Sequence, residues 1–156
     1  MSTAFAQDGP SPHRGGPAAS SSLLTEFRQA HEVLIAAMEG MDRLTRQSNA
    51  DPSCFANAKW RISQASLARR TLWGAIFRHL LPRANLKDVV ELDRLSTADW
   101  EMLCYSANHI STWASGRIEA DWEGYCEASR AIRWRVKVCL GAERRILYPL
   151  MDREAG

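Results

Sequence analysis

The fold is decided by one stretch near the C-terminus, Cys139-Leu140-Gly141-Ala142-Glu143-Arg144-Arg145-Ile146-Leu147-Tyr148-Pro149-Leu150. It closes a long helical pattern whose inward positions alternate steps of four and three residues: Ile118, Trp122, Tyr125, Ser129, Ile132, Val136, Cys139, Glu143, Ile146 and Leu150. This spacing predicts a helix that packs along the seam of a bundle. Glu143 lies on the inward side, where a carboxylate is costly unless it meets a metal, a cation or a hydrogen-bond donor. The partner of Glu143 is therefore the main functional question.

Size and composition indicate one globular domain. The chain has 156 residues, 46% of them hydrophobic, and a net charge of +2. This length is enough to bury a core without disulfides. The small net charge gives no indication of a nucleic-acid partner. The four cysteines lack the CxxC spacing of metal or redox motifs, so we expect them to remain thiols.

No segment of the sequence suggests a membrane. No apolar run reaches the roughly 18 residues of a membrane span. The N-terminus lacks a basic segment followed by an apolar core, so we expect no signal peptide and a cytoplasmic protein.

Three more long helical patterns precede the last one. Together with it they predict an all-α, antiparallel, up-and-down four-helix bundle over residues 23–151. Nothing alternates with the period of two that strands require. We expect the long helices at about 23–47, 54–81, 96–114 and 117–151, a short connecting helix at 83–95, and tails at 1–22 and 152–156.

Polar residues on or beside the inward sides of the first three helices are candidates for a site. His31 lies four residues after Phe27, so it is either a metal ligand or a histidine held by hydrogen bonds. Arg69 interrupts the apolar stripe Phe55, Ala58, Ile62, Ala65, Leu72, Ile76. Its side chain either extends to water, or Arg69 or Arg70 pairs with a buried carboxylate. We expect His79 at a helix end, and His109 at the surface or boundary of the third helix. The predicted inward stripe of the third helix consists of Trp100, Leu103, Ala107, Ile110 and Ala114.

The segment Glu143-Arg144-Arg145-Ile146-Leu147-Tyr148-Pro149-Leu150 resembles the close of a hemerythrin-like (HHE cation-binding) domain, in which a pattern H-x-x-x-E-x-x-x-L-[YF]-P ends a bundle helix. Ala30-His31-Glu32 in the first helix and Leu80-Leu81-Pro82 at the end of the second are also similar to that family, as found in proteobacteria. The resemblance covers about residues 23–151. It implies the bundle fold, a di-iron site and a role in sensing or carrying oxygen or nitric oxide.

The sequence differs from the family at positions where the resemblance implies metal ligands. The resemblance implies a histidine and, four residues later, a glutamate on both the second and the last helix. Here Cys139 replaces the last histidine, Glu143 is kept, and the second helix has Leu72 and Ile76. His31 matches the first-helix histidine. We therefore expect no di-iron centre, although His31, Glu143 and Cys139 could form a remnant site for one metal such as zinc.

Without a metal, Glu143 needs another partner, and His31 and Arg69 are the candidates. We expect Glu143 to be held by a buried ion pair or hydrogen bond that fixes helix register. The expected function is that of a non-enzymatic cytoplasmic binding or regulatory module without a bound cofactor. It would act through its surface or as a homodimer. The alternative is an iron- or zinc-dependent sensor or carrier of oxygen or nitric oxide.

Each of two further features of the last helix has two possible interpretations. Its outer side carries Arg130, Arg133, Arg135, Lys137, Arg144 and Arg145. This set is either a solvated face balanced by acids on neighbouring helices or a docking patch for an acidic partner. Cys139 is either a buried, inert thiol or a redox-active one, whose pKa nearby cations would lower.

Overall fold

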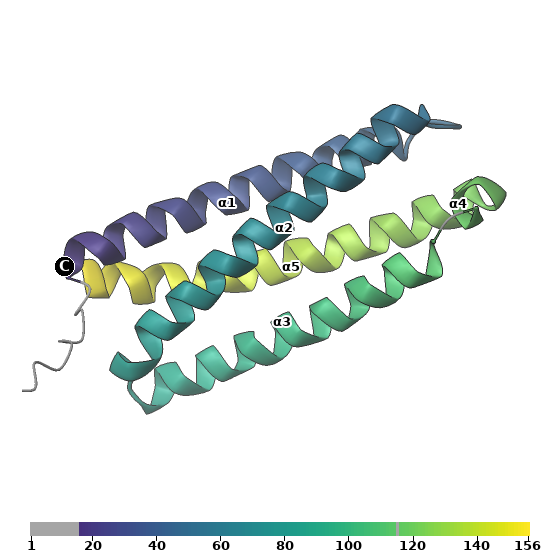
Figure 1. Cartoon of the computed structure of the whole chain (residues 1–156). Coiled ribbons are helices and arrows are strands. Elements are labelled where there is room, and N and C mark those ends of the chain that lie inside the picture. Colours follow the sequence, from purple (N-terminus) through teal and green to yellow (C-terminus); the bar gives the residue numbers. More distant parts are fainter. Residues whose placement is uncertain (1–15, 115) are drawn as a thin grey trace, which may run out of the picture.

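The computed structural model describes residues 16–114 and 116–156, and these are helical almost throughout (Figure 1). The elements are α1 (Pro17–Leu44), α2 (Pro52–Leu80), the 3-10 turn η1 (Leu81–Arg83), α3 (Leu86–Thr112), α4 (Arg117–Ala120) and α5 (Trp122–Ala155). No strand occurs in these ranges, which confirms the all-α prediction. Most of the predicted N-terminal tail, residues 1–15, lies outside the described part.

Both predicted tails are too long, because helix continues into each of them. α1 begins at Pro17 rather than near Leu23, and Ser20 is buried, with its hydroxyl 2.8 Å from Nε2 of His79. At the other end, α5 runs to Ala155. Ion pairs join this last turn to three other elements: Asp152 to Arg28, Arg153 to Asp88 and Glu154 to Arg83.

The expected short connecting helix at 83–95 is also wrong, because it is the first part of α3. The Asn85 side chain caps α3 by accepting a hydrogen bond from the Asp88 amide at 3.0 Å. Leu92 and Leu95 are buried, and the helix continues through Ser96 without a break. The sequence 96–99 resembles a helix start, but it offers no glycine or proline that would interrupt a helix already formed. A short helix does occur, as α4, one connection later.

The long helices pack unevenly along their length. α1 contacts both α2 and α5, and α3 contacts α5. α2 and α3 are joined through η1 and then diverge (Figure 1). The largest apolar cluster lies beside that turn, and we call it the packed end: Leu24, Phe27, Ile76, Leu80, Leu92, Leu95, Leu147, Leu150 and Met151. It contains the two buried residues of α3, Leu92 and Leu95.

None of the helices in the described residues combines the length and the hydropathy needed to cross a bilayer.

Candidate functional site

Glu143 is buried in the middle of α5, and both of its carboxylate oxygens have donors. Nε2 of His31 lies 2.8 Å from Oε2, and Nε of Arg69 donates to the same oxygen at 3.1 Å. Nη2 of Arg69 donates to Oε1. The same Arg69 nitrogen also donates to Asp99 at 2.9 Å. The structure therefore brings both expected partners, His31 and Arg69, to Glu143, and adds Asp99, which the sequence did not single out for this role.

The imidazole of His31 is fixed from both sides. Because a carboxylate only accepts, Nε2 donates to Glu143, and Nδ1 can accept from the Tyr148 hydroxyl 2.7 Å away. The ring of Phe27 packs against it with centroids 4.3 Å apart, and His31 is fully buried. We call His31, Arg69, Asp99, Glu143 and Tyr148 the Glu143 cluster. It takes side chains from α1, α2, α3 and α5, so it ties the four long helices together.

Two carboxylates keep the guanidinium of Arg69 charged. Burial lowers the pKa of Arg69, but Glu143 and Asp99 raise it more, so the net shift is upward. The buried guanidinium therefore stays protonated between two acids. Arg70 adds a weaker contact, 3.7 Å from Asp99. A buried pair of this kind is costly to break, because the remaining partner keeps a charge without a counterion.

The remnant metal site predicted from His31, Glu143 and Cys139 is only partly assembled. His31 and Glu143 touch, but Cys139 is half-buried and makes no hydrogen bond to them. Within the described residues, no group of three or more histidine, cysteine or acidic side chains is arranged to hold a metal ion. A metal at Glu143 would also have to displace the donors from Arg69 and His31.

The thiol of Cys139 does not fit the reactive interpretation. Burial raises its pKa, and the Glu143 carboxylate raises it further. A thiol with a raised pKa carries less thiolate at neutral pH and is less reactive. The nearby arginines lower the pKa by less than these two effects raise it.

Leu72 and Ile76, the apolar replacements on α2, lie in or against the packed end. Ile76 is fully buried and Leu72 packs beside it. Carbon therefore fills the core next to His31 and Glu143, while Arg69, one to two turns earlier on α2, reaches the carboxylate.

The predicted position of a second arginine, Arg133, is wrong. Arg133 was expected on the outer basic face, but it is 4% exposed. Its guanidinium donates to Asp42 at 2.9 Å, to Thr45 at 3.0 Å and to the Ser129 hydroxyl. Asp42 and Thr45, beside the apolar stripe of α1, are the signal that could have identified this partner. Lys137 lies 3.8 Å from Asp42.

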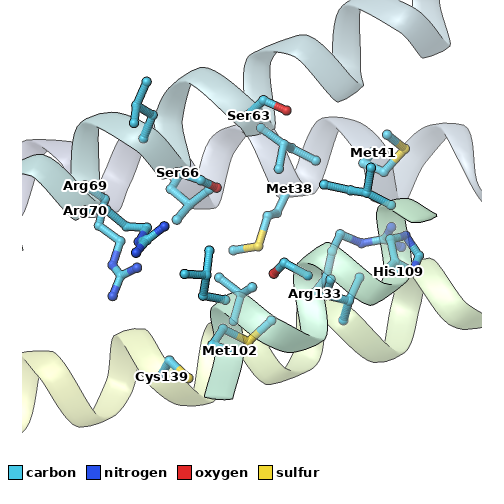
Figure 2. Close-up of a pocket in the computed structure, with 18 of the residues that line it drawn as sticks. Met38, Met41, Ser63, Ser66, Arg69, Arg70, Met102, His109, Arg133 and Cys139 are labelled. Carbon is cyan, nitrogen blue, oxygen red and sulfur yellow. The ribbon is translucent and has the colours of Figure 1, made fainter. Parts of the chain in front are cut away.

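Between the Glu143 cluster and Arg133 lies a cavity of about 370 Å³ (Figure 2). Its walls come from α1, α2, α3 and α5. The middle is apolar, with Met38, Met102, Leu34, Ile62, Leu103, Ile132, Val136 and Leu140. In Figure 2 Arg69 and Arg70 lie toward one end and His109 and Arg133 toward the other.

The predicted stripe of α3 only partly matches the side of the helix that lines the cavity. Trp100 and Ile110 of that stripe are 65% and 68% exposed. The α3 residues that line the cavity are Asp99, Met102, Leu103, Ser106, His109 and Ile110, and none of them is buried. Only Leu103 and Ile110 among them belong to the predicted stripe. His109, expected at the surface or boundary, lies in the cavity wall. Burial lowers its pKa, and the charges of Lys59 and Arg133 lower it further.

Comparison with protein-family models, with curated proteins and with solved structures finds no match for this chain.

Proposed function

We propose that this protein is a non-enzymatic binding or regulatory module, built as a hemerythrin-like four-helix bundle in which the Glu143 cluster takes the place of a metal site. The observation that carries the proposal is the pairing of both Glu143 oxygens by Arg69 and His31. Arg69 brings a positive charge to a carboxylate that would otherwise attract a cation. The internal pairing of these groups supports a structural role for them.

The position of the cluster suggests how binding could be communicated. Arg69 and Asp99 belong to the cluster and also line the cavity. A molecule in the cavity would therefore act on an ion pair that joins α2, α3 and α5. Outside, Trp60, Trp100 and Trp134 are 64%, 65% and 66% exposed and offer apolar surface for a protein partner or a second copy.

Metal analysis tests the proposal. The full-length protein is expressed in medium supplemented with iron and zinc, purified without chelators, and analysed by elemental mass spectrometry. We expect substoichiometric iron and zinc, and the same result for Glu143→Gln and for the exposed control Glu127→Gln.

Stoichiometric iron with an oxo-bridge absorption band would contradict the proposal, if Glu143→Gln removed the metal and Glu127→Gln did not. That result would instead support the sensor or carrier of oxygen or nitric oxide.

A further inference from the structure

The cavity beyond the Glu143 cluster has the dimensions and the lining of a ligand site. Small-molecule pockets are typically about 300–1,000 Å³, mostly apolar, with a few polar groups that orient the ligand, and in bundles they lie between helices. The volume of about 370 Å³ falls in this range. The flexible thioethers of Met38, Met41 and Met102 can adapt to different hydrocarbon shapes.

At the Arg69 end of the cavity the charges balance. Arg69 is shared between Glu143 and Asp99, and Arg70 pairs with Asp99. Two cations thus face two acids, and the guanidinium of Arg69 is already held by three hydrogen bonds. This end offers little attraction to a further anion.

At the other end the positive charges exceed the negative ones. Lys59 and Arg133 line it with His109, and Asp42 is the acid that pairs with Arg133. Among the described residues no carboxylate pairs with Lys59, whose ammonium lies 5.5 Å from the centroid of the Phe55 ring. Lys59 is exposed on α2, so its ammonium can move toward the cavity without breaking an ion pair. Burial lowers the pKa of His109, and the positive charges of Lys59 and Arg133 lower it further.

We infer that the cavity binds an apolar monocarboxylate, with its hydrocarbon chain along the methionine-lined middle and its carboxylate toward Lys59, His109 and Arg133. Lys59 supplies the ammonium that pairs with the carboxylate, and His109 can donate a ring N–H. Arg133 is held by Asp42, Thr45 and Ser129, so it contributes a fixed positive charge. The inference rests on the proposed binding role and names the ligand class for it.

Isothermal titration with decanoate and its neutral analogue decanol, both below their aggregation limits, tests the charge preference. We expect the wild-type protein to bind decanoate roughly tenfold more tightly than decanol, the effect of one charge-assisted hydrogen bond. Lys59→Met should weaken decanoate roughly tenfold and leave decanol unchanged. Lys87→Met, an exposed lysine of α3 that does not line the cavity, is the matched control and should change neither.

The location of the ligand is tested separately. Ser106→Phe places a ring in the cavity from α3 and should abolish binding of both molecules, whereas Ser111→Phe on the exposed side of α3 should not. A proton NMR titration of His109 gives a second readout. Bound decanoate should raise the His109 pKa, because its charge favours imidazolium, and bound decanol should lower it by removing water.

Equal affinities for decanoate and decanol would overturn the inference, as would binding of neither or full retention of binding in Ser106→Phe. None of these results depends on metal content. Failure here therefore leaves the metal analysis to decide the proposed function, and stoichiometric iron would contradict that function whatever the titrations show.

Discussion

The two parts of the structure on either side of the Glu143 cluster are built differently. At the packed end, apolar side chains from α1, α2, α3 and α5 pack together, and Phe27, Ile76, Leu92 and Met151 are completely buried. From Asp99 onward, α3 instead lines a cavity with half-buried or exposed residues. The comparison shows a tightly packed core at one end and an internal cavity at the other, with an ion-pair cluster between them.

Breaking the cluster between the two parts should have the largest effect. Glu143→Leu leaves Arg69 buried with Asp99 as its nearest acid, so we expect a loss of about 3–5 kcal/mol in the free energy of unfolding. Glu143→Gln can still accept hydrogen bonds and should cost about 1–2 kcal/mol. Urea unfolding of both variants measures this, and equal, negligible losses would refute a structural role for the carboxylate.

Truncation of leucines compares the two parts directly. Leu147→Ala at the packed end should cost about 2–5 kcal/mol, because the rigid surroundings leave a void. Leu103→Ala in the cavity wall should cost less than about 1 kcal/mol, because that side chain is only partly packed. Comparable losses in the two variants would show that the cavity wall is as tightly packed as the core.

Filling the cavity should make the open part resemble the packed end. Ser106→Phe is expected to raise the free energy of unfolding by about 0.5–2 kcal/mol, since the new ring buries apolar surface in existing space. Thermal unfolding by circular dichroism measures it, with Ser111→Phe as the exposed control. A lower melting temperature for Ser106→Phe alone would mean that the space cannot accept a ring.

The smallest expected effect is a pH dependence from His109. Its ring is surrounded by Lys59 of α2 and by Tyr125 and Arg133 of α5, and its folded pKa lies below the ordinary 6.5. Below about pH 6.5 the unfolded chain therefore binds a proton that the folded chain resists. Stability should fall as the pH decreases through this window to the folded pKa, and less so in His109→Gln. Parallel pH profiles for the two proteins would contradict this.

The sequence predicted the Glu143 cluster better than the cavity. The helical spacing places Glu143 on the inward side, and the cost of burying a carboxylate shows that it needs a partner. His31 and Arg69 are polar residues on or beside the apolar stripes of the first two helices. Arg133 could not be placed in the same way, because it is one of six cations in residues 130–145 and its burial depends on Asp42 from α1.

The boundaries of α3, and the side of α3 that faces inward, were harder to predict for a related reason. α3 has apolar residues on more than one side, for example Trp100 on one and Met102 on another, so the pattern does not decide which side faces inward. The long continuous α3 likewise depends on Leu92 and Leu95 packing against the core rather than on a local signal. Long-range contacts decide both features, and no short stretch of sequence contains them.

The double-mutant cycle of Arg69→Met and Glu143→Leu tests the central claim most directly, which is that these two side chains satisfy each other where a metal would otherwise be expected. If they do, each single variant leaves the other member of the Arg69–Glu143 pair behind, whereas the double variant removes both. Asp99 then keeps only its contact with Arg70. The loss in the double variant should then be at least about 2 kcal/mol smaller than the sum of the single losses. Additivity within about 0.5 kcal/mol would contradict the claim.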